Sequence, residues 1–278
     1  MQALGEQNWV RQNLGRQNLG QQKMGKQKMQ HAFRAGLMVI VFAVLSSPAV
    51  HAQAPRITDS NRNTWYMFFG DHRLTDKWGV HTEFQFRRQN TIKDPQQTLV
   101  RPAVNYYLRD GVLLTMGYGF FETYPYGGFP FPREFPEHRI FEQVQINNSI
   151  GRVALINRYR LEQRWAKFPS GSDYLFLNRM RYMLRANVPL MGPTIDAHEP
   201  FVSFYDELFI GFGGNVPNIF DQNRAFASIG YKFNKQGSIE VGYMNQTLQQ
   251  RNQRVYEHNH TLQIILTYNM DFRKHRKP

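Results

Sequence analysis

Arginine and glutamate recur at alternate positions in several segments of this sequence. Residues 158–164 read Arg-Tyr-Arg-Leu-Glu-Gln-Arg, so the charged residues occupy one set of alternate positions. A guanidinium binds carboxylates, phosphates and similar anions through paired hydrogen bonds, which makes such a series a candidate for anion chemistry or for internal ion pairing. The charge ladder, as we call the whole series, consists of Glu83, Arg87, Arg101, Arg139, Arg158, Arg160, Glu162, Arg164, Arg179, Arg181, Arg185, Glu207, Arg224 and Glu240.

The elements that must position these residues are long β-strands. Alternate side chains of a strand point to opposite faces, and alternation of this period extends from residue 64 to residue 272. Residues 78–87, for example, place Trp, Val, Thr, Phe and Phe on one face and His, Glu, Gln and Arg on the other. The alternating runs exceed the ~5–6 residues that are usual in soluble domains. Length and pattern together predict an all-β fold, an antiparallel transmembrane β-barrel with its apolar face toward lipid.

Turns between the runs alternate between short and long, as they do in outer-membrane barrels. The short ones fall at residues 109–111, 150–151 and 234–237, and the long ones at 90–97, 124–137, 166–173, 212–221 and 250–256. We find about eleven runs, whereas an antiparallel barrel closes with an even number. We therefore expect 10–12 strands, with one run misread or another strand hidden in residues 53–62. Glu142 and Asp206 fall on the apolar face of their runs, which predicts β-bulges that shift the register there.

The beginning of the chain predicts export. Residues 1–28 contain a polar, Gln-rich five-residue repeat, which we interpret as disordered. Alternatively, the true start of the protein is Met24 or Met29, and the residues before it are not part of the protein. Residues 29–52 have the pattern of a signal peptide: a basic residue, the apolar run 37–45 and a small-residue site that predicts cleavage after Ala52. Residues 53–62 are then a lead-in, residues 63–272 the barrel and residues 273–278 a basic tail.

Charge and cysteine content narrow the class further. The 278-residue chain has a formal net charge of +13, but residues 1–52 hold six basic and one acidic residue, so the mature chain has a net charge of +8. Its arginines alternate into one face instead of clustering on a surface, which disfavours nucleic acid as a partner. The absence of cysteine excludes disulfides and a lipoprotein anchor. We expect a monomer in the outer membrane of a Gram-negative bacterium, in contact with outer-membrane lipid.

The charge ladder supports two interpretations of the barrel interior. In the structural one, arginine and glutamate from neighbouring strands pair across a narrow barrel that side chains largely fill. In the functional one, the excess of arginine over glutamate leaves positive charge in open water and favours small anionic solutes, as in a porin-like pore. A soluble sandwich or lipocalin-like barrel is disfavoured, because its solvated face is usually rich in Lys and Glu instead of Arg.

A membrane-embedded hydrolase has less support. It needs a nucleophile beside a base, such as serine with histidine. His258 and His260 share one face of a run, and Ser149, Ser203 and Ser228 lie in other runs, but no motif joins them. Two histidines are also too few for structural zinc, which takes four ligands. We therefore expect no enzymatic activity, no catalytic residue, no metal site and no cofactor.

The loop at residues 124–137 is the most unusual connection. Residues 124–136 contain four prolines and five aromatic residues, which are too many for a plain solvated turn. The aromatic residues are Tyr124, Tyr126, Phe129, Phe131 and Phe135. The loop has three interpretations: a plug of the barrel mouth, a surface that offers aromatic rings to a sugar or protein partner, or a stiff, self-packed loop. The second of these makes a ligand-binding or adhesive barrel the alternative function.

Several motifs resemble an uncharacterised family, domain of unknown function number 2490, whose members are expected to form outer-membrane barrels. The most specific are R-x-R-x-E-x-R at residues 158–164, R-x-R-Y at residues 179–182 and D-Q-N-R at residues 221–224. The resemblance extends over residues 63–270. The resemblance implies a β-barrel fold and an outer-membrane location. It assigns no catalytic residue, because the family has no established activity.

Overall fold

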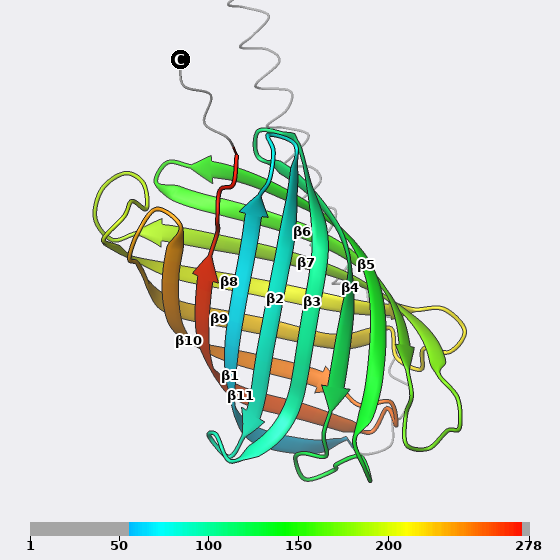
Figure 1. Cartoon of the computed structure of the whole chain (residues 1–278). Helices are drawn as coiled ribbons and strands as arrows, with labels where there is room; N and C mark the ends of the chain where they lie inside the picture. Colours follow the sequence, from blue (N-terminus) through cyan, green and yellow to red (C-terminus); the bar gives the residue numbers. More distant parts are fainter. Residues whose placement is uncertain (1–55, 274–278) are drawn as a thin grey trace, which may run out of the picture. The chain divides into compact units, whose positions relative to one another are not determined.

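The structure, a computed structural model, describes residues 56–273, which form eleven β-strands and no helix (Figure 1). The strands are β1 (Ile57–Arg73), β2 (Trp78–Gln89), β3 (Asp94–Arg109), β4 (Val112–Thr123), β5 (Phe135–Ile150), β6 (Val153–Ala166), β7 (Leu175–Pro189), β8 (Glu199–Phe212), β9 (Phe220–Lys232), β10 (Gly237–Gln249) and β11 (Val255–Tyr268). They form one closed barrel, which confirms the predicted all-β barrel of 10–12 strands. Within the described part of the chain, no helix is long and apolar enough to cross a membrane. The repeat, the predicted signal peptide with its predicted cleavage site and most of the basic tail lie outside the described residues.

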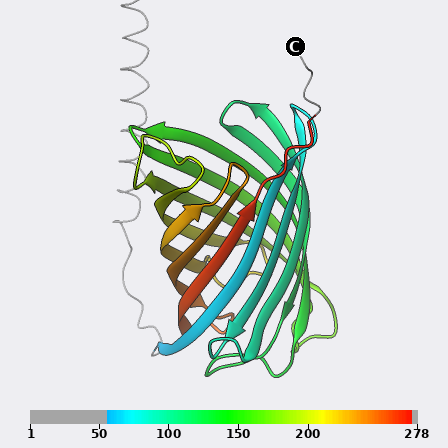
Figure 2. The same cartoon turned by 60° about the vertical axis from the view of Figure 1, so that its left-hand side comes forward.

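The barrel closes through a parallel pair of strands. Each strand pairs antiparallel with the next, while β1 pairs parallel with β11 from Ile57 opposite Val255 to Phe69 opposite Thr267. The blue β1 and the red β11 lie side by side in both views of the barrel (Figures 1 and 2). When every consecutive pair is antiparallel, a barrel of eleven strands closes through a parallel pair of its first and last strands. The expectation of an even number was therefore wrong, and the count of eleven runs was right.

The first strand begins earlier than the sequence predicted. Residues 57–62, expected to be part of a lead-in, belong to β1 and pair with β11 alone, because the pairing of β1 with β2 begins at Asn63 opposite Gln89. These residues read Ile-Thr-Asp-Ser-Asn-Arg, which is polar on both faces. A strand without an apolar face gives no alternation, and this explains why the pattern did not identify it.

The connections divide the barrel into two ends. At the short-turn end lie residues 74–77, 110–111, 151–152, 190–198 and 233–236; at the loop end lie residues 90–93, 124–134, 167–174, 213–219 and 250–254. The connection at residues 190–198 is longer than the others at the short-turn end. Because the strand number is odd, β1 begins at the loop end and β11 ends at the short-turn end.

Apolar side chains cover the outside of the barrel, and polar ones fill the inside. On β2, Phe84 and Phe86 are 42% and 57% exposed, whereas Glu83 and Gln85 are 2% and 3% exposed. The same polarity holds on the other strands, where the exposed large residues are mostly Val, Leu, Ile, Met, Phe and Tyr. A soluble barrel has the opposite polarity, with its apolar residues inside.

Glu142 and Asp206 are not accompanied by bulges, so that expectation was wrong. The described strand pairs shift register at Arg87/Arg88, Tyr107/Arg109 and Phe209/Ile210 instead. Both carboxylates lie on the outer face, where each accepts a hydrogen bond from an amide of the next strand. Gln163 Nε2 donates to Glu142 at 3.1 Å, and Asn223 Nδ2 donates to Asp206 at 3.0 Å.

We expect a disulfide to form between cysteines introduced at Ser60 and His258, which are opposite each other in the parallel β1–β11 pair. Strand neighbours lie within the Cα separation that a disulfide needs, and the chain has no cysteine of its own. Oxidation of the folded S60C/H258C protein should give a cross-linked band on a non-reducing gel. In the control pair S60C/L262C, the second position lies four residues further along β11. Cross-linking of the control alone, with both test thiols reactive toward maleimide, would contradict the parallel closure.

Candidate functional site in the barrel interior

The residues of the charge ladder all point into the barrel, and they do so because they share the inward face of their strands. Thirteen of the fourteen line one internal cavity of about 660 Å³. The remaining one, Glu162 on β6, is 1% exposed because arginines enclose it. Proximity in the barrel therefore joins residues that are up to about 150 positions apart in the chain.

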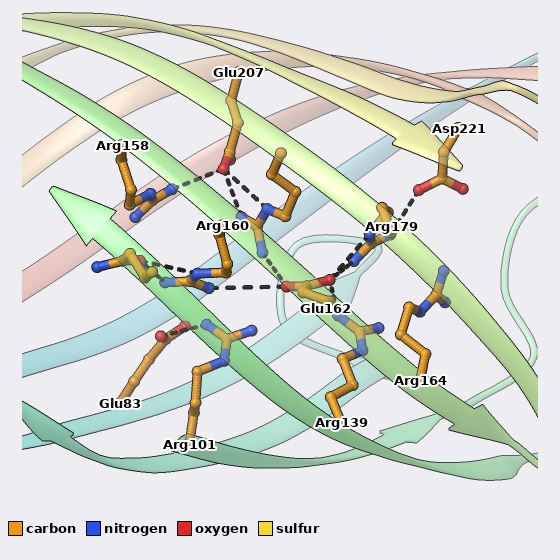
Figure 3. A network of polar contacts seen from close by, with 12 residues as sticks. Glu83, Arg101, Arg139, Arg158, Arg160, Glu162, Arg164, Arg179, Glu207 and Asp221 are labelled. Carbon is orange, nitrogen blue, oxygen red and sulfur yellow. Dashed lines mark hydrogen bonds and ion pairs between the residues drawn. The ribbon is translucent and has the colours of Figure 1, made fainter. Parts of the chain in front are cut away.

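Glu162 is the centre of the largest ion-pair cluster (Figure 3). Arg179 Nη2 and Arg181 Nη1, both from β7, lie 2.6 Å from its two oxygens. Arg139 of β5 and Arg160 of β6 lie further away, at 3.6 and 3.9 Å. One carboxylate thus has four guanidiniums around it, two of them at hydrogen-bond distance.

Glu207 of β8 is the second centre of this cluster. Its Oε1 accepts hydrogen bonds from Arg158 Nη2 at 2.8 Å and from Arg181 Nη2 at 2.7 Å. Arg224 of β9 lies 3.9 Å from Oε2. Because Arg181 binds both Glu162 and Glu207, it links the two centres across β6, β7 and β8.

Two carboxylates of the cluster were not part of the charge ladder predicted from the sequence. Glu137 binds Arg139 at 2.6 Å and Arg164 at 2.5 Å, and Asp221 binds Arg179 at 2.6 Å. Glu137 lies two positions before Arg139 on the same strand face, so the alternation contains the information that locates it. Asp221 has no partner in the β8–β9 register, which jumps from Gln222 to Phe220. The bulge turns its side chain inward, and no alternation rule identifies such a residue.

The cluster holds more positive than negative charge. It contains seven arginines and four carboxylates among the described residues, namely Arg139, Arg158, Arg160, Arg164, Arg179, Arg181 and Arg224 with Glu137, Glu162, Glu207 and Asp221. Burial of an uncompensated charge is costly, so the excess requires another source of stabilisation.

Inward-facing aromatic rings supply part of this stabilisation. The guanidinium carbon of Arg139 lies 3.5 Å from the ring centroid of Phe121, and that of Arg181 lies 4.4 Å from the centroid of Phe209. Arg160 lies 4.7 Å from the centroid of Phe141. A cation over an aromatic face gains about 0.5–2 kcal/mol, depending on its desolvation. Phenylalanines on the charged face of a strand are therefore part of the charge network.

Smaller charge groups lie closer to the short-turn end. Arg101 of β3 pairs with Glu83 of β2, and His81 Nδ1 lies 2.8 Å from Asp71 on β1. On the opposite wall, Arg185 pairs with Glu240 at 2.6 Å.

Arg87 lies near the loop end of β2 and forms no ion pair with any described residue. It donates instead to two side-chain amides, at 2.6 Å to Gln97 and at 2.7 Å to Gln85.

The internal cavity reaches both ends of the barrel. Its lining includes Phe131 and Arg251 at the loop end, and Lys235 and Gln236 at the short-turn end. Among the described lining residues are thirteen arginines and lysines and seven aspartates and glutamates. Basic residues therefore outnumber acidic ones in the lining of this cavity.

The loop at residues 124–134 extends across the loop end and is attached to the opposite wall. Tyr126 donates to Glu257 of β11 at 2.7 Å, and Gly128 N donates to Asp59 of β1 at 3.0 Å. Burial and the neighbouring Glu257 carboxylate raise the pKa of Tyr126 well above its usual value, which favours the protonated hydroxyl that donates to Glu257. Tyr126, Phe131 and Phe135 line the cavity, whereas Tyr124 and Phe129 do not. The loop thus lies at the loop end of the cavity, and the plug interpretation of it stays a prediction.

The histidines considered for hydrolysis lie on the other side of the barrel wall from Ser203 and Ser228. His258 and His260 are on the outer face, where His260 Nδ1 lies 2.5 Å from the Tyr243 hydroxyl. Ser203 and Ser228 are inside the barrel and donate to Asn187 and Glu240. Within residues 56–273, no three His, Cys, Asp or Glu side chains form a group that could hold a metal ion.

Comparison with known proteins yields a family and one relative. Residues 62–257 match the family described as "Protein of unknown function (DUF2490)". The sequence is also similar to an uncharacterized protein of Methylorubrum extorquens, with 31% identity over 173 residues, which cover 59% of this chain and 69% of the relative. No solved structure matches this chain.

We expect Glu162→Gln to destabilise the barrel by about 3–5 kcal/mol, since it removes one of the two carboxylates that buried Arg179 and Arg181 each bind. Urea unfolding of the protein in detergent micelles, followed by tryptophan fluorescence, measures the change. Glu142→Gln is the matched control, because Glu142 lies on the outer face with one amide partner. It should change the free energy of unfolding by less than about 1 kcal/mol. Equal effects of the two substitutions would contradict a central role for Glu162.

Proposed function

This chain belongs to the family described as "Protein of unknown function (DUF2490)", and we propose that it is an outer-membrane β-barrel whose interior is a narrow, anion-preferring pore. The observation that carries the proposal is the internal cavity, which reaches both ends of the barrel and is lined by thirteen basic and seven acidic residues of the described chain.

The outer surface supports a location in a membrane. Strands of 12 to 17 residues are long enough to cross an outer membrane at the usual tilt, which takes about 9–11 residues. Their outward side chains are mostly apolar, and their inward side chains are mostly polar or charged. The export signal predicted at residues 29–52 agrees with this location.

Preference for anions follows from the composition of the lining. A pore lined by excess arginine and lysine attracts anions and repels cations, and low-dielectric walls strengthen both effects. Because Glu162 and Glu207 are each surrounded by several arginines, their negative charge is largely screened from a passing ion. The ion pairs also narrow the passage, so we propose small anions as solutes. No catalytic residue, metal or cofactor is part of the proposal.

A purely structural barrel is the second candidate. It is favoured by the loop at residues 124–134, which is hydrogen-bonded to the opposite wall across the loop end. In that case the arginines and glutamates serve only to fill and brace the interior. Conductance of the purified mature protein in a planar bilayer distinguishes the two candidates, since only a pore gives stable, anion-biased current steps under a salt gradient.

Neutralisation of lumen arginines should weaken the preference for anions. We expect the R158Q/R160Q/R181Q protein to show a reversal potential closer to zero than the wild type under a potassium chloride gradient, because three positive charges leave the lining. The R109Q/R133Q protein, which loses two exposed arginines that do not line the cavity, should retain the wild-type value. Circular dichroism must show that both proteins are folded. An unchanged reversal potential in the folded triple variant would argue against the pore.

The loop at residues 124–134 should limit the current. We expect the conductance to rise when residues 125–134 are replaced by a short Gly-Ser linker, since Tyr126 and Phe131 then no longer narrow the loop end. Replacement of residues 90–93, which do not line the cavity, is the control. A conductance that is equal in the two proteins would show that this loop does not obstruct the passage.

A further inference from the structure

Arg224 is a buried cation whose hydrogen-bonding capacity is unused. Its guanidinium lines the cavity but donates no hydrogen bond to any residue in the described range, and its Nε is enclosed without a partner. The nearest carboxylate oxygen, Glu207 Oε2, is 3.9 Å from Nη1. Arg158 and Arg181 already occupy the other oxygen of Glu207. An arginine fork is therefore held in the interior without an anion at hydrogen-bond distance.

Aromatic rings hold Arg224 in place. Its guanidinium carbon lies 4.7 Å from the ring centroid of Phe209 and 5.0 Å from that of Trp65. Trp65 is itself fixed by a hydrogen bond of 2.8 Å from its indole nitrogen to Gln96. The guanidinium carbon of Arg87 lies 3.8 Å from the centroid of the same indole. Two cations without a close carboxylate thus contact one tryptophan, and their combined potential favours an anion in the adjoining cavity.

An apolar wall adjoins this positive region. Met67 and Phe69 follow Trp65 on the inward face of β1, toward the short-turn end, and both line the cavity. Ile265 of β11 and Tyr205 of β8 line it as well and pack in the same cluster. Because it lies beside Arg224 and Arg87, this wall is suited to the hydrocarbon part of an anionic solute and not to hydrated inorganic ions.

We propose that the lumen contains a binding site for amphipathic carboxylates, that is, organic acids with an aromatic or short aliphatic body. The two Nη groups of Arg224 donate to the carboxylate in the bidentate geometry of guanidinium–carboxylate pairs. Arg87 adds a second positive charge, and the apolar body packs against Met67, Phe69 and Ile265. The site rests on the proposed function in one respect, since it requires a lumen that solutes can enter.

Benzoate is the probe, and isothermal titration of the folded mature protein in detergent micelles is the measurement. We expect saturable binding of benzoate and weaker binding of acetate, which has the same carboxylate but almost no apolar body. Arg224→Gln should weaken benzoate binding about tenfold or more, because a hydrogen-bonded charged group is lost. The matched control Arg109→Gln removes an exposed arginine outside the cavity and should leave binding unchanged.

A second substitution keeps the proposal testable if the Arg224 variant does not fold. Ile265→Thr changes the apolar wall without changing charge, and it should reduce the preference for benzoate over acetate. Equal binding of benzoate and acetate by the wild type, or undiminished benzoate binding by folded Arg224→Gln, would contradict the proposed site.

Conductance separates the site from the proposed pore. Benzoate binding without conductance would support the site and refute the pore. Conductance without benzoate binding would uphold the pore and refute the site.

Discussion

The structure depends on the pairing of Glu162 and Glu207 with the arginines that surround them. Burial of a guanidinium without a counter-charge is costly. These two carboxylates bind arginines from β6 and β7, and arginines of β5 and β9 lie within 4 Å of them. The pairs join strands side by side across the wall and fill the interior where a soluble barrel would place aliphatic side chains. Because charge occupies the inside, the apolar faces of the same strands must lie outside, and the polarity of the whole barrel follows.

The network contains fewer carboxylates than arginines. The proposed preference for anions depends on this excess of positive charge. Phenylalanine rings compensate part of the excess, as the contact of Arg139 with Phe121 shows. The remainder produces a positive lining around the cavity. An interior that was only a brace would be expected to balance its charges, whereas one that receives anions has a reason to keep arginines such as Arg224 unpaired.

The sequence predicted those parts of the molecule that follow from strand periodicity. Alternation places Arg158, Arg160 and Glu162 on one face, and in the barrel that face is the interior. Three features had no periodic pattern and could not be predicted. The polar start of β1 has no apolar face, Asp221 is turned inward by a register shift, and the parallel β1–β11 closure is a pairing between chain ends that no local pattern encodes. Pairing distances and the cavity depend on strands that meet only in the closed barrel.

The proposed membrane location requires that the apolar face of the barrel contacts lipid while the arginine network lies in the lumen. Quenching of tryptophan fluorescence by lipids with brominated acyl chains tests it in reconstituted vesicles. One single-tryptophan protein keeps inward Trp65, and the other carries Phe84→Trp on the outward face of β2, with the remaining tryptophans replaced by phenylalanine in both. Strong quenching at position 84 and weak quenching of Trp65 is the result that this structure predicts. Stronger quenching of Trp65, or no quenching in either protein, would contradict a barrel with its charged face inside and lipid outside.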